Sequence, residues 1–141
     1  EYGDELSSEQ IVQLFRKEYI DFAGKYQLLR HRFTELNEAD GSIHSRFEGE
    51  ISVAGEKKSV VGVGNGPIDA FFQALNGVGI NGYEFVNYRE HAISKGSDAK
   101  GICYIELKQK NNGHIFGVGI HSNINVAALR GIICAINRAE K

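Results

Sequence analysis

One motif occurs twice in this chain, and the repeat limits the folds that are open to it. The segment Val61–Ala70 has the pattern Gly-x-Gly followed by a polar turn, and it runs into the apolar stretch 71–76. The segment Phe116–Asn125 has the same pattern and runs into the apolar stretch 126–137. Each copy predicts a strand, a Gly/Asn-rich turn and a helix that ends at asparagine. Two helix N-termini at related positions suit a small anionic ligand better than a catalytic centre.

The residues before each copy alternate between apolar and polar side chains, which is typical of strands. We expect the strands and helix of the first unit at 26–33, 43–53, 57–63 and 67–76, and those of the second at 83–94, 99–109, 114–120 and 124–138. Gly55 marks a hairpin turn in the first unit. A three-stranded sheet with one helix cannot bury both of its faces alone. We therefore predict an α+β fold in which two βββα units pack together.

A helix is also predicted before the first unit. Ser7 and Gln10 form a plausible capping box, and apolar residues then recur at helical spacing over about 8–21. We assign residues 1–24 to a polar lead and linker helix. Residues 25–141 form one domain, with the first βββα repeat at 25–78 and the second at 82–138. The apolar residues of the predicted helix are Ile11, Leu14, Phe15, Tyr19 and Phe22.

The composition indicates an ordinary globular domain. The 141 residues have a hydrophobic content of 42% and a formal net charge of −2. This charge argues against nucleic acid and anionic membranes as partners. We expect neither a signal peptide nor a membrane span, and a cytoplasmic location. Cys103 and Cys134 lie within apolar patterns, so we expect two buried free thiols in a reducing compartment.

The first turn, Gly64-Asn65-Gly66-Pro67, places proline at the first helical position, where its missing N–H costs nothing. Backbone N–H groups at such a turn can bind an anion such as the carboxylate of an amino acid. The alternative is a tight turn that needs glycine for its dihedral angles. The spacing matches neither a dinucleotide-binding fingerprint nor a phosphate-binding loop.

The segment Tyr88–Ala92 places a glutamate beside a histidine, as some catalytic sites do. Neighbours on a strand point to opposite faces, so Glu90 and His91 are not expected to form an acid–base pair. Tyr88, Glu90 and Ala92 share one face. The five histidines show no metal-ligand spacing, and no nucleophile motif is present. Ala99 and Gly101 share a face, where small residues either leave room for a ligand or admit a helix closely.

These motifs, in this order and spacing, resemble the C-terminal regulatory domain of 2-isopropylmalate synthase. The resemblance extends from Lys25 to Arg138 and rests on the first turn with its helix, on Tyr88–Ala92 and on Gly117–Ile120 with the helix that follows. It implies feedback inhibition by L-leucine, bound between two domains of a homodimer. The catalytic barrel of the same chain, which uses acetyl-CoA and a divalent metal, would lie outside this sequence. The fragment itself is then expected to hold no cofactor or metal and to catalyse nothing.

The resemblance also implies which residues bind leucine. Backbone groups of the two turns would hold the carboxylate, Asp69 is a candidate for the ammonium or a first-turn dipole residue, and apolar and small residues would enclose the side chain. The expected ligand-binding residues are Asn65, Gly66, Ile68, Asp69, Phe85, Tyr88, Ala92, Ala99, Gly101, Ser122 and Ile124.

Two alternatives remain open. One is the corresponding domain of citramalate synthase, which would bind isoleucine; the small Ala92 and Ala99 favour leucine. The other is a dimerisation module that binds no amino acid. A small stand-alone enzyme built on Glu90, His91 or Cys103 is disfavoured by the strand geometry.

Overall fold

The computed structural model describes residues 10, 24–93, 99–110 and 113–140. The linker helix predicted over about 8–21 lies outside the described residues, apart from Gln10. The described chain forms two compact units, one over Lys25–Tyr83 and the other from Glu84 onward together with Gly24. Each unit is three strands followed by one helix, so the predicted α+β fold with two βββα units is confirmed. The assignment of 1–24 and 25–141 to a linker and a domain stays a prediction.

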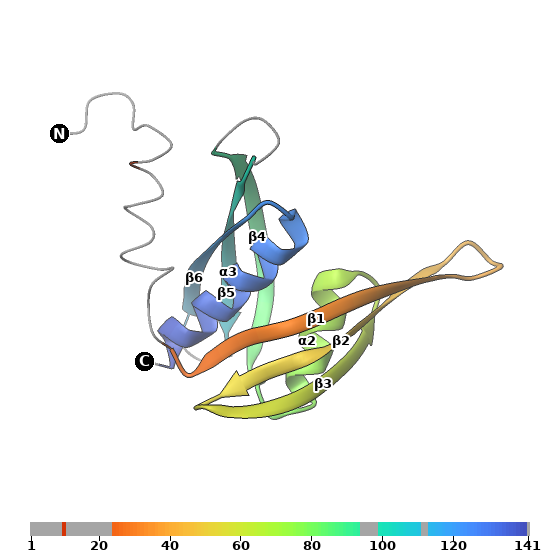
Figure 1. The fold of residues 1–141 in the computed structure, drawn as a ribbon, viewed down its shortest axis with the longest axis horizontal. Helices are drawn as coiled ribbons and strands as arrows, with labels where there is room; N and C mark the ends of the chain where they lie inside the picture. The colour runs from red at the N-terminus through yellow and green to blue at the C-terminus, as the bar shows by residue number, and fades with distance from the viewer. Residues whose placement is uncertain (1–9, 11–23, 94–98, 111–112, 141) are drawn as a thin grey trace. The chain divides into compact units, whose positions relative to one another are not determined.

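The first unit contains β1 (Tyr26–Asn37), β2 (Ile43–Val53), β3 (Glu56–Gly64) and α2 (Pro67–Asn76). The strands are antiparallel in the order β1-β2-β3, as Figure 1 shows. Between β2 and β3 the chain turns through Ala54 and Gly55, whose φ angles are 53° and 88°. Positive φ at both central residues defines the tight turn that matches strand twist, so Gly55 occupies the predicted hairpin turn.

Strand β1 is longer than its apolar pattern predicts. Alternation ends near Phe33, yet the strand continues to Asn37, which pairs with Ile43 at the start of β2. The last four residues, Thr34–Asn37, are exposed. Pairing of strands uses backbone groups and does not require buried side chains, so hydrophobic periodicity misses this extension.

The second unit contains β4 (Tyr83–Ala92), β5 (Gly101–Gln109), β6 (Gly113–His121) and α3 (Ile124–Ala139). The strand order is β4-β5-β6, with β5 in the centre. The paired strands β5 and β6 run from Gly101 opposite His121 to Gln109 opposite Gly113. Strand β5 begins two residues later than predicted, so Ala99 precedes the strand rather than lying within it.

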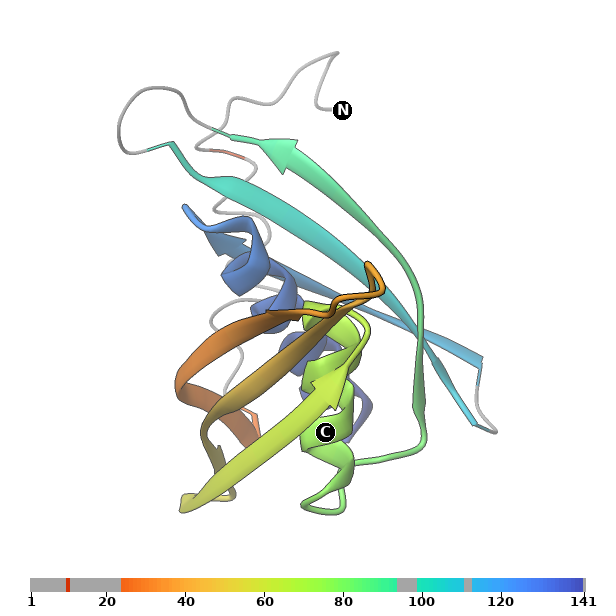
Figure 2. The same ribbon diagram turned by 90° about the vertical axis from the view of Figure 1, so that its right-hand side faces the viewer.

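The repeated Gly-x-Gly pattern has the same packing role in both units. A Cβ added at Gly62 of β3 would overlap backbone atoms of α2, with Ala74 Cα at 2.9 Å. A Cβ added at Gly117 of β6 would overlap α3 in the same way, with Ala135 Cα also at 2.9 Å. Only glycine allows the helix backbone to lie this close to the strand. The duplicated motif therefore packs each helix onto its own sheet, and Figure 2 shows α2 lying along the sheet of the first unit.

The start of the central strand β5 is buried on both faces, whereas Lys108 near its end is exposed. Gly117 and Gly119 face α3, so alternation along β6 turns Val118 and Ile120 to the other face of the sheet. There they form a buried cluster with Ile93 and Ile102. On the α3 side, Cys103, Ile105 and Leu107 are at most 1% exposed. A strand with apolar residues on both faces reads as a continuous hydrophobic run, as 102–105 does.

Cys103 and Cys134 are buried free thiols, as predicted. Burial, and secondarily the negative charge of Glu90, raises the pKa of the Cys103 thiol to about 11. Burial also raises the pKa of the Cys134 thiol. A thiol with a raised pKa holds its proton near neutral pH and is a poor nucleophile. These cysteines therefore act as small core residues.

Candidate functional site

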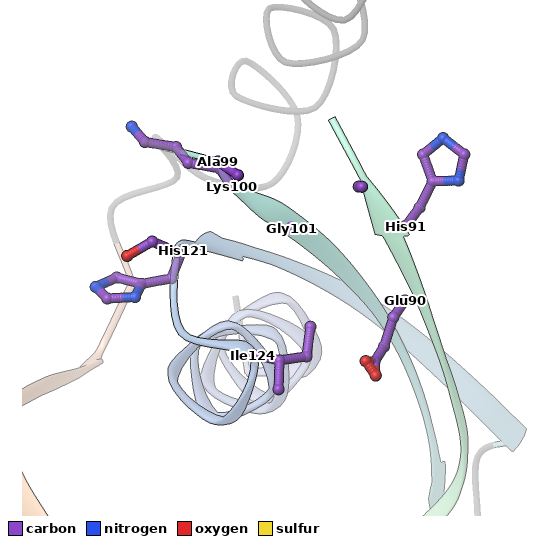
Figure 3. Close-up of a pocket in the computed structure, with 9 residues that line it drawn as sticks. Glu90, His91, Ala99, Lys100, Gly101, His121 and Ile124 are labelled. Atoms are coloured by element: carbon purple, nitrogen blue, oxygen red, sulfur yellow. The ribbon is translucent and has the colours of Figure 1, made fainter. Parts of the chain in front are cut away.

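A pocket opens at one end of the sheet of the second unit. It lies where β4 ends, β5 begins and β6 turns into α3, and its volume is about 320 Å³ (Figure 3). Five of the expected ligand-binding residues line it, together with four that were not expected. The lining residues are Glu90, His91, Ala92, Ala99, Lys100, Gly101, His121, Ser122 and Ile124.

The turn that carries Ser122 and Ile124 is held by two hydrogen bonds that the sequence Asn123-Ile124-Asn125 makes possible. Asn123 is the N-cap of α3, and its side-chain oxygen accepts from the backbone N–H of Asn125 at 2.9 Å. Its own backbone N–H donates to Nδ1 of His121 at 2.9 Å. Asparagine is a favoured N-cap because its side chain satisfies N–H groups that the helix leaves unpaired. One wall of the pocket is therefore fixed by the cap.

Gly101 leaves room at the base of the pocket. A Cβ added there would lie 3.5 Å from Cδ1 of Ile124 and 3.8 Å from the carbonyl oxygen of His91. Both are ordinary contact distances, in contrast to the overlap at Gly117. Helix packing thus requires glycine at Gly117 but not at Gly101. Of the two interpretations of this small residue, the structure favours space beside Ile124 over close approach of a helix backbone.

Glu90 and His91 lie on opposite faces of β4, as strand alternation predicts. Figure 3 shows the Glu90 carboxylate directed to the side of Ile124, whereas the His91 ring points to the other side of the strand. The two side chains therefore do not form an acid–base pair. His91 borders the pocket near Gly101 through its backbone carbonyl.

Phe85 and Tyr88 lie farther along β4 and are not among the lining residues of this pocket. Their ring centroids are 6.1 Å apart and the rings are inclined by 43°. Three residues of extended strand span about 10 Å, and alternation would direct these side chains to opposite faces. The two rings are therefore close although they are three positions apart on β4, and neither lines this pocket.

The four expected residues of the first unit, Asn65, Gly66, Ile68 and Asp69, occupy the turn from β3 into α2. The backbone N–H of Asn65 donates to Oδ2 of Asp69 at 2.9 Å. The other carboxylate oxygen of Asp69 is 3.5 Å from Nε2 of Gln73. Gly66 is the N-cap and provides no side-chain hydrogen bond. Asp69 thus acts as a first-turn residue of α2. Its carboxylate accepts the hydrogen bond from the backbone N–H of Asn65, one of the N–H groups that were expected to bind an anion.

His121 is held in its neutral form. Burial lowers the pKa of His121 from its usual 6.5, and the charges of Arg130 and Lys100 lower it further. The neutral ring has an unprotonated nitrogen, which is what the hydrogen bond from the Asn123 N–H requires. Arg130 itself donates to the carbonyl oxygen of Ile120 at 3.0 Å. The positive charges of Arg130 and Lys100 therefore favour the neutral His121 ring, which accepts the hydrogen bond from Asn123 at the start of α3.

Sequence reasoning missed Glu90, His91, Lys100 and His121 as lining residues. Glu90 could have been found, because it shares a strand face with Tyr88 and Ala92, which were already expected in the site. Lys100 lies between Ala99 and Gly101, so parity alone assigned it to the other face. His121 precedes the expected Ser122, and only the hydrogen bond to Asn123 shows its role.

The described residues contain no group of three or more His, Cys, Asp or Glu side chains placed to hold a metal ion. None of the helices in the described part of the chain has the length and apolar character needed to cross a membrane.

Comparison with known proteins agrees with the fold. The family model of the LeuA allosteric (dimerisation) domain matches residues 5–140. The 2-isopropylmalate synthase of Clostridium acetobutylicum is 38% identical over 137 residues, which cover 96% of this chain and 24% of that protein. The 2-isopropylmalate synthases of Thermobifida fusca and Azoarcus sp. are 35% and 37% identical, with 99% and 98% of this chain covered and 23% of each relative.

The fold defines a two-unit α+β domain in which the same turn motif precedes both helices. The chain belongs to the LeuA allosteric (dimerisation) domain family. The predicted resemblance to the regulatory domain of 2-isopropylmalate synthase is thereby confirmed, and dimerisation is part of the family description. The chain spans about 24% of the length of the relative from Clostridium acetobutylicum.

Proposed function

We propose that this domain binds L-leucine in the pocket of the second unit and regulates a 2-isopropylmalate synthase by feedback inhibition. The observation that carries the proposal is the pocket itself, in which five residues expected for leucine lie together: Ala92, Ala99, Gly101, Ser122 and Ile124. The allosteric family and the name of the relatives, 2-isopropylmalate synthase, support leucine as the ligand, because it is the end product of the pathway to which that enzyme belongs.

The chemistry of the pocket suits a branched aliphatic amino acid. Ile124 and Ala92 offer apolar surface, and Gly101 leaves space beside Ile124. Burial of an isobutyl group contributes about 2–3 kcal/mol. A dissociation constant of about 1 mM already requires about 4 kcal/mol. Polar contacts to the ammonium and carboxylate groups must therefore supply much of the affinity, and these contacts distinguish an amino acid from a simple hydrocarbon.

We further propose that leucine binds at the interface of a homodimer. Ile124 and Tyr88 are large apolar side chains that are 38% and 44% exposed within one chain. A second copy that covers them would enclose the ligand and remove this apolar surface from water. We also propose that residues of the first turn contribute to leucine binding: Asn65, Gly66, Ile68 and Asp69.

The regulated partner is a catalytic barrel of the same chain, with acetyl-CoA as substrate and a divalent metal. Leucine can inhibit such a barrel only if it binds two states of the regulatory dimer with different affinity. The linker predicted over residues 1–24 is the segment through which this difference would reach the barrel.

Thermal unfolding of this chain with leucine, isoleucine, valine or no ligand tests the proposal. Leucine at about 100 times its dissociation constant adds about 2.7 kcal/mol to the free energy of unfolding and raises Tm by several degrees. A larger shift with isoleucine would assign the domain to citramalate synthesis instead. No shift with any of the three, for a folded dimer, would leave a dimerisation module without an amino-acid ligand.

A further inference from the structure

We propose that Glu90 binds the ammonium group of the amino acid in the pocket of the second unit. This inference rests on the proposed leucine binding and names the residue that recognises its charged end. It transfers to Glu90 the role for which Asp69 was the sequence-based candidate.

The position of Glu90 follows from two independent observations. Glu90 lines the pocket, and Figure 3 shows its carboxylate directed to the side of Ile124. Ile93, three positions further along the chain, packs with Ile102 and Val118 on the face of the sheet away from α3. Glu90 has the opposite parity to Ile93, so alternation places it on the α3 side, which is the side on which Ile124 lies.

The two candidate carboxylates differ in what they already bind. Asp69 accepts the N–H of Asn65 at 2.9 Å and lies 3.5 Å from Gln73. Within the described residues, the Glu90 carboxylate makes no hydrogen bond and no ion pair. A carboxylate without partners at the edge of an apolar pocket is suited to a ligand that brings three N–H donors. An ammonium supplies these donors together with the opposite charge.

The remaining polar groups fix the orientation of the ligand. With the ammonium at Glu90 on β4, the ligand carboxylate lies toward Ser122 and the N-terminal end of α3, where the helix dipole favours negative charge. The branched side chain then packs against Ile124 and Ala92, which offer the apolar surface of the pocket. An amino acid thus spans the pocket from β4 to the turn before α3.

The test compares Glu90→Gln with wild type for two ligands, L-leucine and 4-methylpentanoate, which has the same carbon skeleton without the ammonium. Calorimetry on the dimeric chain should show leucine affinity lowered about ten- to hundred-fold by Glu90→Gln. Affinity for 4-methylpentanoate should remain within two-fold of wild type. Glu84→Gln, at the other end of β4, serves as the matched control and should change neither affinity.

Equal leucine affinity of wild type and Glu90→Gln would overturn the role of Glu90 and leave leucine binding intact. No leucine binding by wild type would overturn both proposals. If Glu90→Gln does not fold, Glu90→Asp is measured instead; it keeps the charge but withdraws it by one methylene. That variant should bind leucine several-fold more weakly than wild type, and unchanged affinity would again contradict the proposal.

Discussion

The backbone N–H of Asn65 and Oδ2 of Asp69 are joined by a hydrogen bond of 2.9 Å across the first turn of α2. The equivalent turn of the second unit is closed by Asn123, which precedes its helix. The two copies of the motif therefore stabilise their helix N-termini from opposite sides of the helix start. In the first unit the carboxylate also complements the helix dipole.

Asp69→Asn should lower the free energy of unfolding of the ligand-free chain by about 1 kcal/mol, because the charge at the helix start and its hydrogen bond are weakened. Urea denaturation measures this loss. Asn123→Ala should cost a similar amount in the second unit. An Asp69→Asn variant as stable as wild type, with leucine affinity lost, would instead assign Asp69 to the ligand.

Gly117→Ala should destabilise the chain by about 3 kcal/mol, because the added methyl group overlaps the backbone of α3 near Ala135. Gly101→Ala is the matched control on the neighbouring strand, since its methyl group would meet Ile124 at 3.5 Å. We expect this control to keep wild-type stability or to gain slightly through a less flexible unfolded chain. Equal effects of the two substitutions on the urea midpoint would show that the close packing on α3 is not the cause.

Stability should fall in mild acid because of His121. Its pKa is lowered in the fold from 6.5, so the unfolded chain takes up this proton at a higher pH than the folded chain does. The contribution of the neutral His121 to the free energy of unfolding is present above pH 6.5, and it is lost as the pH falls through the pKa of His121 in the folded chain. His121→Gln should reduce the difference in Tm between pH 7.5 and 5.0. A difference in Tm as large in His121→Gln as in wild type would contradict this origin.

Ala92→Ile should weaken leucine binding about ten-fold, because the larger side chain occupies space in the pocket where β4 ends. Stability without ligand should change little, since Ala92 is exposed. Titration calorimetry with leucine measures the affinity. An unchanged affinity would remove Ala92 from the site.

The fold could be predicted from the sequence because the signals were local. Strand alternation, the Gly-x-Gly repeat and Pro67 defined both βββα units, and the predicted bounds of β2, 43–53, and of α2, 67–76, agree with the structure. The end of β1 could not be predicted in this way, since Thr34–Asn37 pair through backbone groups while their side chains stay in water.

The site was predicted less completely, because its geometry depends on contacts that the sequence pattern does not contain. Strand alternation placed Glu90 on the same face as Ala92. It could not show that the carboxylate of Asp69 already accepts a hydrogen bond within the described residues while that of Glu90 does not. The hydrogen bond from Asn65 to Asp69 closes within a single turn and depends on the path of the backbone there. The contact between Phe85 and Tyr88 likewise does not follow from the alternation of side chains along β4.

The position of β5 between β4 and β6 has a consequence for the order in which the second unit opens. Amide hydrogens of a central strand exchange with solvent mainly when the whole unit unfolds, whereas edge strands exchange through smaller openings. Gly101 is the first residue of β5, and Glu90 lies near the end of the edge strand β4. A ligand that contacts both Gly101 and Glu90 would link the edge strand β4 to the central strand β5, so that β4 opens less often by itself. Its binding should slow amide exchange in β4 more than in β5.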